Sequence, residues 1–238
     1  MLFRSQADDL RIDPQVISLH LQTPRSQRLR FVSGQSVTLT LGGDIRKTLP
    51  IASCPCDDRN LFFHIPDLPG DPFCEAVHTD HVSPRDVVQL EGPLPGDFFL
   101  DTRDDRPSLF LCWHTGFAPA ISLIEHAMSL EIEQDIVLLR FSPTPDSQYL
   151  ANLCRSWADA FDSLHVELRP ERITLLTGAD TCQSILENAL SGHAGLDTFN
   201  VYVSGPPNFT DGARKALAAR GVPEAQVKVH VDWMMALS

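Results

Sequence analysis

The chain has 238 residues, of which 43% are hydrophobic and 21% are charged, and its formal net charge is −12. This composition indicates a folded globular protein of one or two domains, and the negative charge argues against a nucleic-acid partner, which needs a basic face. Because no run of eighteen apolar residues and no charged-then-apolar leader occurs, we expect no membrane span, no secretory signal and a cytoplasmic location.

The first hundred residues alternate between apolar and polar side chains, as half-buried β-strands do. Glycine and proline turns separate the alternating stretches. The alternation predicts strands over residues 16–21, 37–41, 45–53, 61–65, 86–91 and 97–100. A helix is expected over residues 73–82. Many short strands of this kind predict a small antiparallel β-barrel.

A polar stretch at residues 101–107 interrupts this pattern, so we place the first domain at 1–102 and the second at 107–238. Strand and helix patterns alternate after this stretch. The predicted strands are 108–112, 135–139, 164–168, 200–203 and 227–231, and the predicted helices are 119–129, 147–161, 185–190 and 210–220. The alternation predicts an α/β domain with a doubly wound parallel sheet.

The second domain begins with an apolar strand, a turn and a helix between residues 109 and 128. Thr115 and Gly116 allow a tight turn, and Pro119 is tolerated at the start of the helix. Such a turn directs backbone N–H groups toward an anionic or dinucleotide ligand.

Six cysteines occur, and their spacing fits neither a zinc site nor an iron–sulfur cluster. Cys112 lies in the apolar strand, where a small core residue is expected. Cys54 and Cys56 flank a proline, and we interpret them as a reduced pair in a turn. The chain is therefore expected to carry no iron–sulfur cluster of its own.

Five short motifs, in chain order, resemble those of the ferredoxin–NADP reductase superfamily, in which a flavin-binding barrel precedes a nucleotide-binding α/β domain. They are F-x-x-G-Q-x-V at 31–37, I-A-S at 51–53, E-G-P-L-P-G-D-F-F-L at 91–100, T-G-F-A-P at 115–119 and S-G-P-P at 204–207. Residues 149–157 are similar to bacterial oxygenase reductase components and CDP-6-deoxy-glucoseen reductase-like proteins. The resemblance implies FAD on the first domain, NAD(P)H on the second, and hydride transfer between them.

The implied flavin motif is altered at three positions. Counting back from Ser53, the places of an arginine, an aromatic residue and a serine hold Lys47, Leu49 and Pro50. Lys47, or Arg46 with a one-residue slip, supplies positive charge without the bidentate fork of arginine. Leu49 offers no π-face, and Pro50 has neither a hydroxyl nor an N–H. A barrel strand with an edge proline explains the same residues.

The implied diphosphate loop has Gly70, Phe73 and Cys74 as its candidate contacts. Gly70 permits close backbone approach, and Cys74 stands in place of a hydroxyl residue. Asp67 and Asp71 put negative charge beside the proposed diphosphate. Two like charges at ~4 Å repel by ~4 kcal/mol at an effective dielectric constant of about 20, which opposes binding unless the acids point away.

The implied nucleotide site is altered as well. Trp113 and His114 replace two glycines that let the dinucleotide approach, so we expect them to fill part of the cleft. Pro143 stands at the place of an arginine. The resemblance makes the following residues candidate cofactor contacts: Thr115, Gly116, Ser204, Gly205, Pro206 and, at the place of a flavin-shielding aromatic, Trp233. Packing at the chain terminus explains Trp233 equally.

Two other chemistries have weaker support. His114 beside Thr115, with Ser204 opposite, suits acid–base catalysis, but no acidic residue that would orient the histidine is evident. His78 and His81 have a spacing compatible with metal binding, which a solvated polar face explains equally. We therefore expect no metal site.

Two functions remain open from the sequence. The first is a flavin-dependent oxidoreductase that transfers electrons between NAD(P)H and a protein or small acceptor through FAD, with a strongly divergent site. The second is a non-catalytic, reductase-like binding or regulatory subunit that has lost NAD(P)H binding and possibly flavin binding. A protein acceptor in the first function would be a redox partner, and the second function implies a complex partner protein. Because one fold can serve different functions, the resemblance alone does not decide between them. The changes affect both half-sites together, which favours the second function, since a hydride donor site has little use without its acceptor.

Overall fold

The computed structural model of the protein describes residues 2–13, 15–24, 28–42, 44–78, 87–144 and 147–232. The chain divides by its contacts into two compact units. The first comprises Met1–Leu100 and Ile121–Glu131, and the second comprises Asp101–Ala120 and Ile132–Ser238. The domain limits expected from the sequence, 1–102 and 107–238, stay a prediction.

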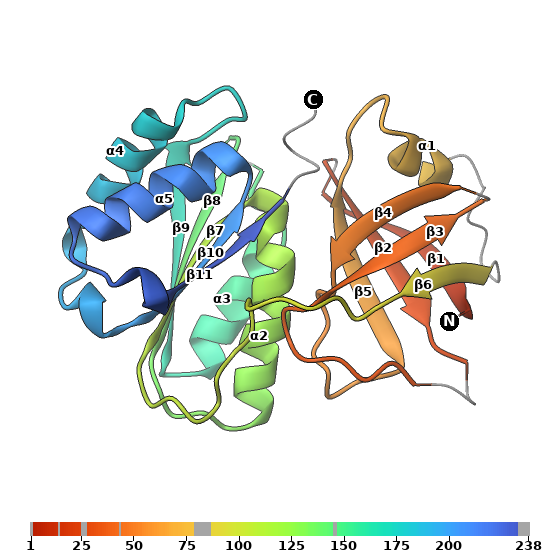
Figure 1. The fold of residues 1–238 in the computed structure, drawn as a ribbon, viewed down its shortest axis with the longest axis horizontal. Coiled ribbons are helices and arrows are strands. Elements are labelled where there is room, and N and C mark those ends of the chain that lie inside the picture. The colour runs from red at the N-terminus through yellow and green to blue at the C-terminus, as the bar shows by residue number, and fades with distance from the viewer. Residues whose placement is uncertain are drawn as a thin grey trace. The chain divides into compact units, whose positions relative to one another are not determined.

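The first unit is built on a six-stranded antiparallel sheet with the strand order β4-β3-β6-β1-β2-β5 (Figure 1). The strands are β1 (Leu2–Asp13), β2 (Val16–Gln22), β3 (Ser36–Leu41), β4 (Ile45–Pro50), β5 (Asn60–Pro66) and β6 (Val87–Glu91). The outermost strands β4 and β5 also contact each other, and the N–H of Ala52 donates to the carbonyl of Phe62 at 2.8 Å. The sheet thus curls toward the small barrel that the alternating sequence predicts.

Alternating burial shows why these residues form strands. Val37, Leu39 and Leu41 of β3 are buried, whereas the residues between them are partly exposed. In the antiparallel pair β2–β5, Leu19 lies opposite Phe63, and both are buried. Matched registers of this kind put the apolar face of every strand on one core.

The first unit differs from prediction in four places, of which one is β4, which ends at Pro50 rather than at residue 53. β1 was not predicted because charged residues interrupt its pattern; it pairs with β2 and β6 on either side, which supply its backbone partners. Residues 97–100 form no strand. The helix expected over 73–82 is observed as α1 (Pro72–His78), and residues 79–86 lie outside the described part of the chain.

The F-x-x-G-Q-x-V motif forms the turn that leads into β3. Gly34 has a φ of +86°, and a Cβ there would lie 2.1 Å from the carbonyl oxygen of Phe98. Gln35 accepts the N–H of Val32 on its side chain at 2.8 Å, and its carbonyl accepts the N–H of Ile51 at 3.0 Å. The motif is therefore explained by a left-handed turn under close packing, independently of any ligand.

The second unit is a five-stranded parallel sheet with the order β11-β10-β7-β8-β9. Its strands are β7 (Ser108–Trp113), β8 (Ile136–Ser142), β9 (Leu164–Arg172), β10 (Asn200–Gly205) and β11 (Val227–Val231). All residues of β7, β8 and β10 are buried, as expected for central strands of a parallel sheet. The predicted α/β doubly wound sheet is confirmed.

Helices flank this sheet on both faces: α4 and α5 lie together on one face, and α3 lies on the other (Figure 1). The helices of the chain's second half are α2 (Phe117–Ser129), α3 (Ala151–Ala160), α4 (Ala179–Ala189) and α5 (Pro207–Ala219). No helix among the described residues is long and apolar enough to cross a membrane.

The strand order of the second unit reverses between β7 and β10. From β7 the chain moves outward through β8 to β9 and then returns to β10 and β11 on the other side. In open parallel sheets, ligands bind beyond the carboxyl ends of the strands at such a switch point. A ligand of this unit is therefore expected beside the residues that end β7 and β10.

Candidate functional site

Trp113 ends β7 and is packed inside the second unit. Its side chain is 1% exposed, and its Nε1–H donates to the carbonyl of Ile173 at 2.8 Å. The backbone of Gly205 approaches so closely that a Cβ there would lie 2.9 Å from Trp113 Cβ. The indole therefore occupies volume that a glycine would leave open, and its hydrogen bond fixes it there.

His114 follows in a 3-10 turn (His114–Gly116) with a φ of +44° and an exposure of 2%. Neither ring nitrogen has a hydrogen-bond partner among the described residues. Burial and the nearby positive charge of Arg140 lower the pKa of His114 to about 4. A neutral imidazole without a proton partner does not support the acid–base role considered from the sequence.

Arg140 in β8 is a buried cation that sequence reasoning missed. Its Nη1–H donates to the carbonyl of Tyr149 at 2.6 Å, and its guanidinium lies 3.9 Å from the ring centroid of Phe117. Nε and Nη2 have no hydrogen-bond partner among the described residues. The only available signal was an arginine directly after the predicted strand 135–139.

The structure brings Thr115, Gly116, Ser204 and Gly205 together at the switch point. A Cβ on Gly116 would lie 2.3 Å from the carbonyl oxygen of Ser204 and 2.9 Å from the nitrogen of Gly205. Thr115 Oγ1 donates to Asp232 Oδ2 at 3.1 Å, a partner that the sequence did not indicate. These residues pack the turn directly against β10.

Ser204 and Pro206 lie at the carboxyl end of β10. Ser204 is fully buried, and its hydroxyl has no hydrogen-bond partner among the described residues. Pro206 directly precedes α5 and accepts the N–H groups of Phe209 and Thr210 at 3.0 Å. Trp233 lies outside the described residues, so its proposed shielding role stays a prediction.

In the first unit, Lys47 and the start of α1 converge on one carboxylate. Lys47 Nζ lies 2.5 Å from Asp71 Oδ2, and the lysine side chain is only 14% exposed. The N–H groups of Phe73 and Cys74 both donate to Asp71 Oδ1 at 3.0 Å. Burial raises the pKa of Asp71, but Lys47 and these N–H groups outweigh it and hold that pKa below its ordinary value. Asp71 is thus an ionised helix cap at the place of the implied diphosphate.

The other predicted flavin contacts are held by the barrel. Leu49 is buried and Pro50 is half-buried at the end of β4. Ser53 Oγ accepts the N–H of Phe62 at 3.2 Å, and its carbonyl accepts the hydroxyl of Ser122 at 2.7 Å. Ser53 therefore has a structural explanation.

The remaining positions of the loop are less constrained. Gly70 has a φ of +81°, and a Cβ added there would meet no atom within 4 Å, so this glycine serves the turn alone. Cys74 Sγ donates to the carbonyl of Pro66 at 3.3 Å, and burial raises the pKa of its thiol to about 11. His78 pairs with Asp67 at 2.8 Å.

Metal binding finds no support among the described residues. No group of three or more histidine, cysteine, aspartate or glutamate residues is placed to hold an ion there. His81, the second histidine of the spacing noted above, lies outside the described residues.

The interpretation of Cys54 and Cys56 as a reduced pair is wrong in this structure, which joins them in a disulfide. Their Cα atoms lie 5.2 Å apart, within the range that a disulfide spans. The turn brings them together, because the N–H of Asp57 donates to the carbonyl of Cys54 at 3.1 Å. Spacing alone did not show this geometry.

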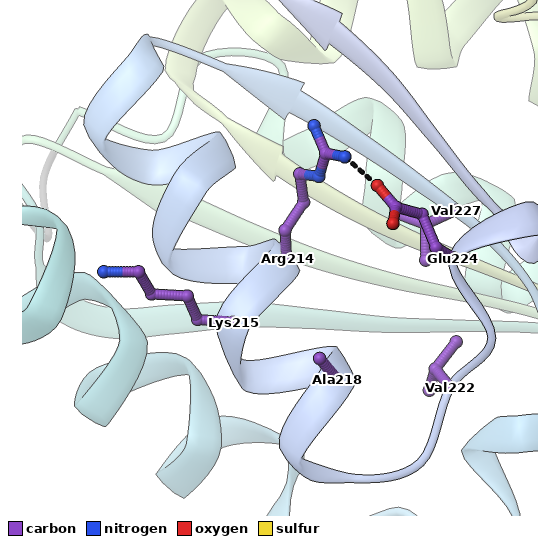
Figure 2. Close-up of a pocket in the computed structure, with 6 residues that line it drawn as sticks. All are labelled: Arg214, Lys215, Ala218, Val222, Glu224 and Val227. Carbon is purple, nitrogen blue, oxygen red and sulfur yellow. Dashed lines mark hydrogen bonds and ion pairs between the residues drawn. The ribbon is translucent and has the colours of Figure 1, made fainter.

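A cavity of about 250 Å³ lies between α5 and the start of β11, lined by Arg214, Lys215, Ala218, Val222, Glu224 and Val227 (Figure 2). Its charges are already satisfied: Arg214 pairs with Glu224, and Lys215 pairs with Asp180 at 2.7 Å. It lies away from the carboxyl ends of the strands. We assign it no ligand.

No protein-family model matches the chain. The reductase component 1 of terephthalate 1,2-dioxygenase from a Comamonas species is 25% identical over 88% of this chain and 61% of its own length. The CDP-6-deoxy-L-threo-D-glycero-4-hexulose-3-dehydrase reductase of Yersinia pestis is 23% identical over 90% of this chain and 63% of its own. The chain thus spans about three fifths of the length of these relatives.

A solved structure shows the same architecture. The ferredoxin–NADP+ reductase of Plasmodium falciparum superposes with a TM-score of 0.76 at 14% identity, over 92% of this chain and 90% of its own. The match confirms, at the level of the fold, the resemblance that the motifs predict. The chain has the ferredoxin reductase-like two-domain fold.

Proposed function

We propose that this chain is a ferredoxin reductase-like, flavin-dependent oxidoreductase that transfers electrons to a protein or small acceptor through FAD held on its first unit. The fold carries this proposal, because an antiparallel barrel and a parallel α/β sheet occur in the order of that class. The names of the relatives, a dioxygenase reductase component and a dehydrase reductase, also support it. Where the acceptor is a protein, that protein is the redox partner of this chain.

The first unit offers a donor set that fits an anionic group of the cofactor. Lys47 Nζ and the N–H groups of Phe73 and Cys74 already surround one anion, the carboxylate of Asp71. These three groups would hold a phosphate oxygen of FAD once Asp71 turned away, and Leu49 would supply an apolar surface. FAD, when bound, supplies the hydride and single-electron chemistry that no side chain of the chain provides.

The second unit does not fit NAD(P)H, the donor that the resemblance implies. Trp113 and His114 are buried rings at the turn where the dinucleotide would approach a glycine backbone. Pro143 replaces the implied arginine, and the buried Arg140 is packed against Phe117 instead. We therefore derive no step through the pyridine nucleotide in this chain.

The packing of Trp113 and His114 favours a second candidate, a non-catalytic reductase-like subunit that binds a partner without electron transfer. That function needs the fold and its surface but no open nucleotide site. It differs from the first candidate in one measurable property, because only the first requires FAD.

The test is a visible absorption spectrum of the purified chain after incubation with FAD and removal of unbound flavin. The proposal expects a retained flavin band that bleaches with dithionite and recovers when ferricyanide is added. Lys47→Gln should weaken FAD binding by about tenfold through loss of one charged contact. The matched control Arg46→Gln, whose native side chain pairs with Glu91 on the surface, should leave it unchanged. Absence of any flavin band at saturating FAD would support the non-catalytic subunit instead.

A further inference from the structure

The Cys54–Cys56 disulfide lies in the turn after β4 and joins residues only two positions apart. A cross-link between near neighbours restricts the unfolded chain little, because the stabilisation that a disulfide gives grows with the length of the loop it closes. Stabilisation of the fold therefore explains this disulfide poorly.

The two sulfur atoms have opposite environments. Cys54 is 6% exposed, and the residue before it is anchored through Phe62 and Ser122, which bond Ser53 at 3.2 and 2.7 Å. Cys56 is exposed in the turn. One half of the disulfide is thus fixed and shielded, whereas the other half is open to an external thiol, as in exchange-active pairs with an attacked and a resolving cysteine.

Three groups of the first unit lie around the buried sulfur. His126 Nδ1 is 3.8 Å and Ser129 Oγ is 3.9 Å from Cys54 Sγ, and the N–H of Cys56 donates to the same sulfur at 3.2 Å. Burial lowers the pKa of His126, so its imidazole is unprotonated at neutral pH. Glu125 accepts the backbone N–H of Cys54, and burial raises the pKa of its carboxyl.

The remaining cysteines do not compete for this chemistry. Cys74, Cys112, Cys154 and Cys182 are free thiols, and each is buried. Burial raises the pKa of the Cys74 and Cys182 thiols to about 11 and that of Cys112 to about 12, which leaves little thiolate at neutral pH. Exchange chemistry is therefore confined to the Cys54–Cys56 pair.

We propose that Cys54 and Cys56 form a redox-active pair that exchanges electrons with an external dithiol. A thiolate of the dithiol attacks Cys56 Sγ, the Sγ–Sγ bond breaks, and its electron pair leaves on Cys54 Sγ, which takes up a proton. The second thiolate of the dithiol then attacks the dithiol sulfur that is bonded to Cys56 Sγ. Cys56 leaves as a thiolate and takes up a proton. Two electrons and two protons pass to the protein, and the dithiol becomes a disulfide.

In the reverse direction, which is the oxidation of the reduced cysteine pair, His126 acts as a base. When a small-molecule disulfide has formed a mixed disulfide on Cys56, the Cys54 thiol passes its proton to His126 Nδ1 and attacks Cys56 Sγ. The leaving thiolate carries away the electron pair and the intramolecular disulfide is restored. His126 is a positioned base for the resolving cysteine in this step.

The first experiment treats the folded chain with dithiothreitol, labels it with iodoacetamide and locates the label by peptide mass spectrometry. We expect label on Cys54 and Cys56 while the other four cysteines stay unlabelled until urea is added. Label on this pair only after unfolding would overturn the proposal, because the disulfide would then be an inert cross-link.

Two variants test the assignment of the sulfur atoms. Cys54→Ser, incubated with oxidised glutathione, should accumulate a stable mixed disulfide on Cys56. Cys56→Ser should form the corresponding adduct on Cys54 about tenfold more slowly, because that sulfur is shielded. Circular dichroism identifies folded samples, and a folded Cys54→Ser chain that forms no adduct would contradict the proposal.

A third variant tests the base. His126→Gln should slow reoxidation of the reduced chain by glutathione disulfide by about tenfold, and the lost rate should return as the pH is raised and Cys54 ionises unaided. His193→Gln, distant in sequence and paired with Glu167, is the matched control and should reoxidise at the native rate. Equal reoxidation rates of the native chain, His126→Gln and His193→Gln at every pH would contradict the assignment of His126 as the base. FAD binding, measured on the same samples, reports separately on the proposed function.

Discussion

The two units differ at the positions where the family resemblance implies a cofactor. In the first unit, Lys47 and two backbone N–H groups still form a donor set for an anion, and the partly exposed carboxylate of Asp71 occupies it. In the second unit, Trp113 and His114 fill the position with buried rings. A side-chain carboxylate leaves its partners at a cost of about 1–3 kcal/mol, whereas a buried ring leaves only with loss of core packing. We therefore expect Asp71 to compete with a cofactor anion at the first position, and Trp113 and His114 to exclude a dinucleotide at the second.

The largest expected effect is the loss of stability when the buried indole of Trp113 is removed. Trp113→Ala should lower the free energy of unfolding by about 3–5 kcal/mol, because it removes a buried ring and the hydrogen bond to Ile173. Urea unfolding followed by circular dichroism measures the loss. Phe161→Ala removes a ring that is 38% exposed and should cost about 1 kcal/mol or less. If both variants lose the same small amount, the second position is not closed by packing.

The next largest loss of stability is expected at the turn after β7, because this turn packs closely against β10. Gly116→Ala should lower the free energy of unfolding by about 3 kcal/mol, because its Cβ would lie 2.3 Å from the backbone oxygen of Ser204. Gly192→Ala, with no atom within 4 Å of its Cβ, is the control and should change stability by about 0.5 kcal/mol or less. A tolerated Gly116→Ala would show that the turn has room to move, and so room for a ligand.

The buried imidazole predicts a pH dependence in the second unit. His114 has a folded pKa of about 4, below its ordinary value of 6.5, so the unfolded chain binds the proton more tightly. Stability is therefore fully present above pH 6.5 and falls as the pH drops toward about 4, by about 3 kcal/mol in total from this residue.

The variant that isolates this contribution is His114→Asn, because asparagine tolerates the positive φ. Between about pH 6.5 and 4 it should lose about 3 kcal/mol less than the native chain, as measured by urea unfolding at each pH. An unchanged slope in His114→Asn would mean that the ring is solvated in the folded chain.

The smallest effect is expected at the anion position of the first unit, where Asp71 contacts Lys47 and two backbone N–H groups. Asp71→Asn should raise FAD affinity by about tenfold, because it removes the competing charge, and asparagine still caps α1. Asp67→Asn is the matched control, since Asp67 pairs with His78 and not with Lys47. Flavin fluorescence titration compares the three chains. Equal or weaker binding by Asp71→Asn would show that Asp71 does not compete with the cofactor.

The fold was largely predictable, because it follows from patterns that the sequence carries locally. Alternation in β3 and the continuous apolar run of β7 each predict their strand, and both are observed. β1 was missed because its pairing partners on either side, rather than its own pattern, make it a strand.

The site was less predictable, because its key contacts join residues far apart in the chain. The acids near the diphosphate loop were evident, but the convergence of Lys47 and two N–H groups on Asp71 required the fold. The buried cation of Arg140 and the bond from Thr115 to Asp232 had no distinctive local signal. The Cys54–Cys56 disulfide depends on one turn hydrogen bond that spacing does not reveal.

The most direct test of the difference between the two units is a pair of calorimetric titrations on one sample of the purified chain. FAD and, separately, NADH and NADPH are titrated up to about 1 mM, where a heat signal detects affinities down to that range. We predict saturable binding of FAD and none of either pyridine nucleotide. Saturable NADH or NADPH binding, with or without FAD, would contradict the claim that Trp113 and His114 close the second position.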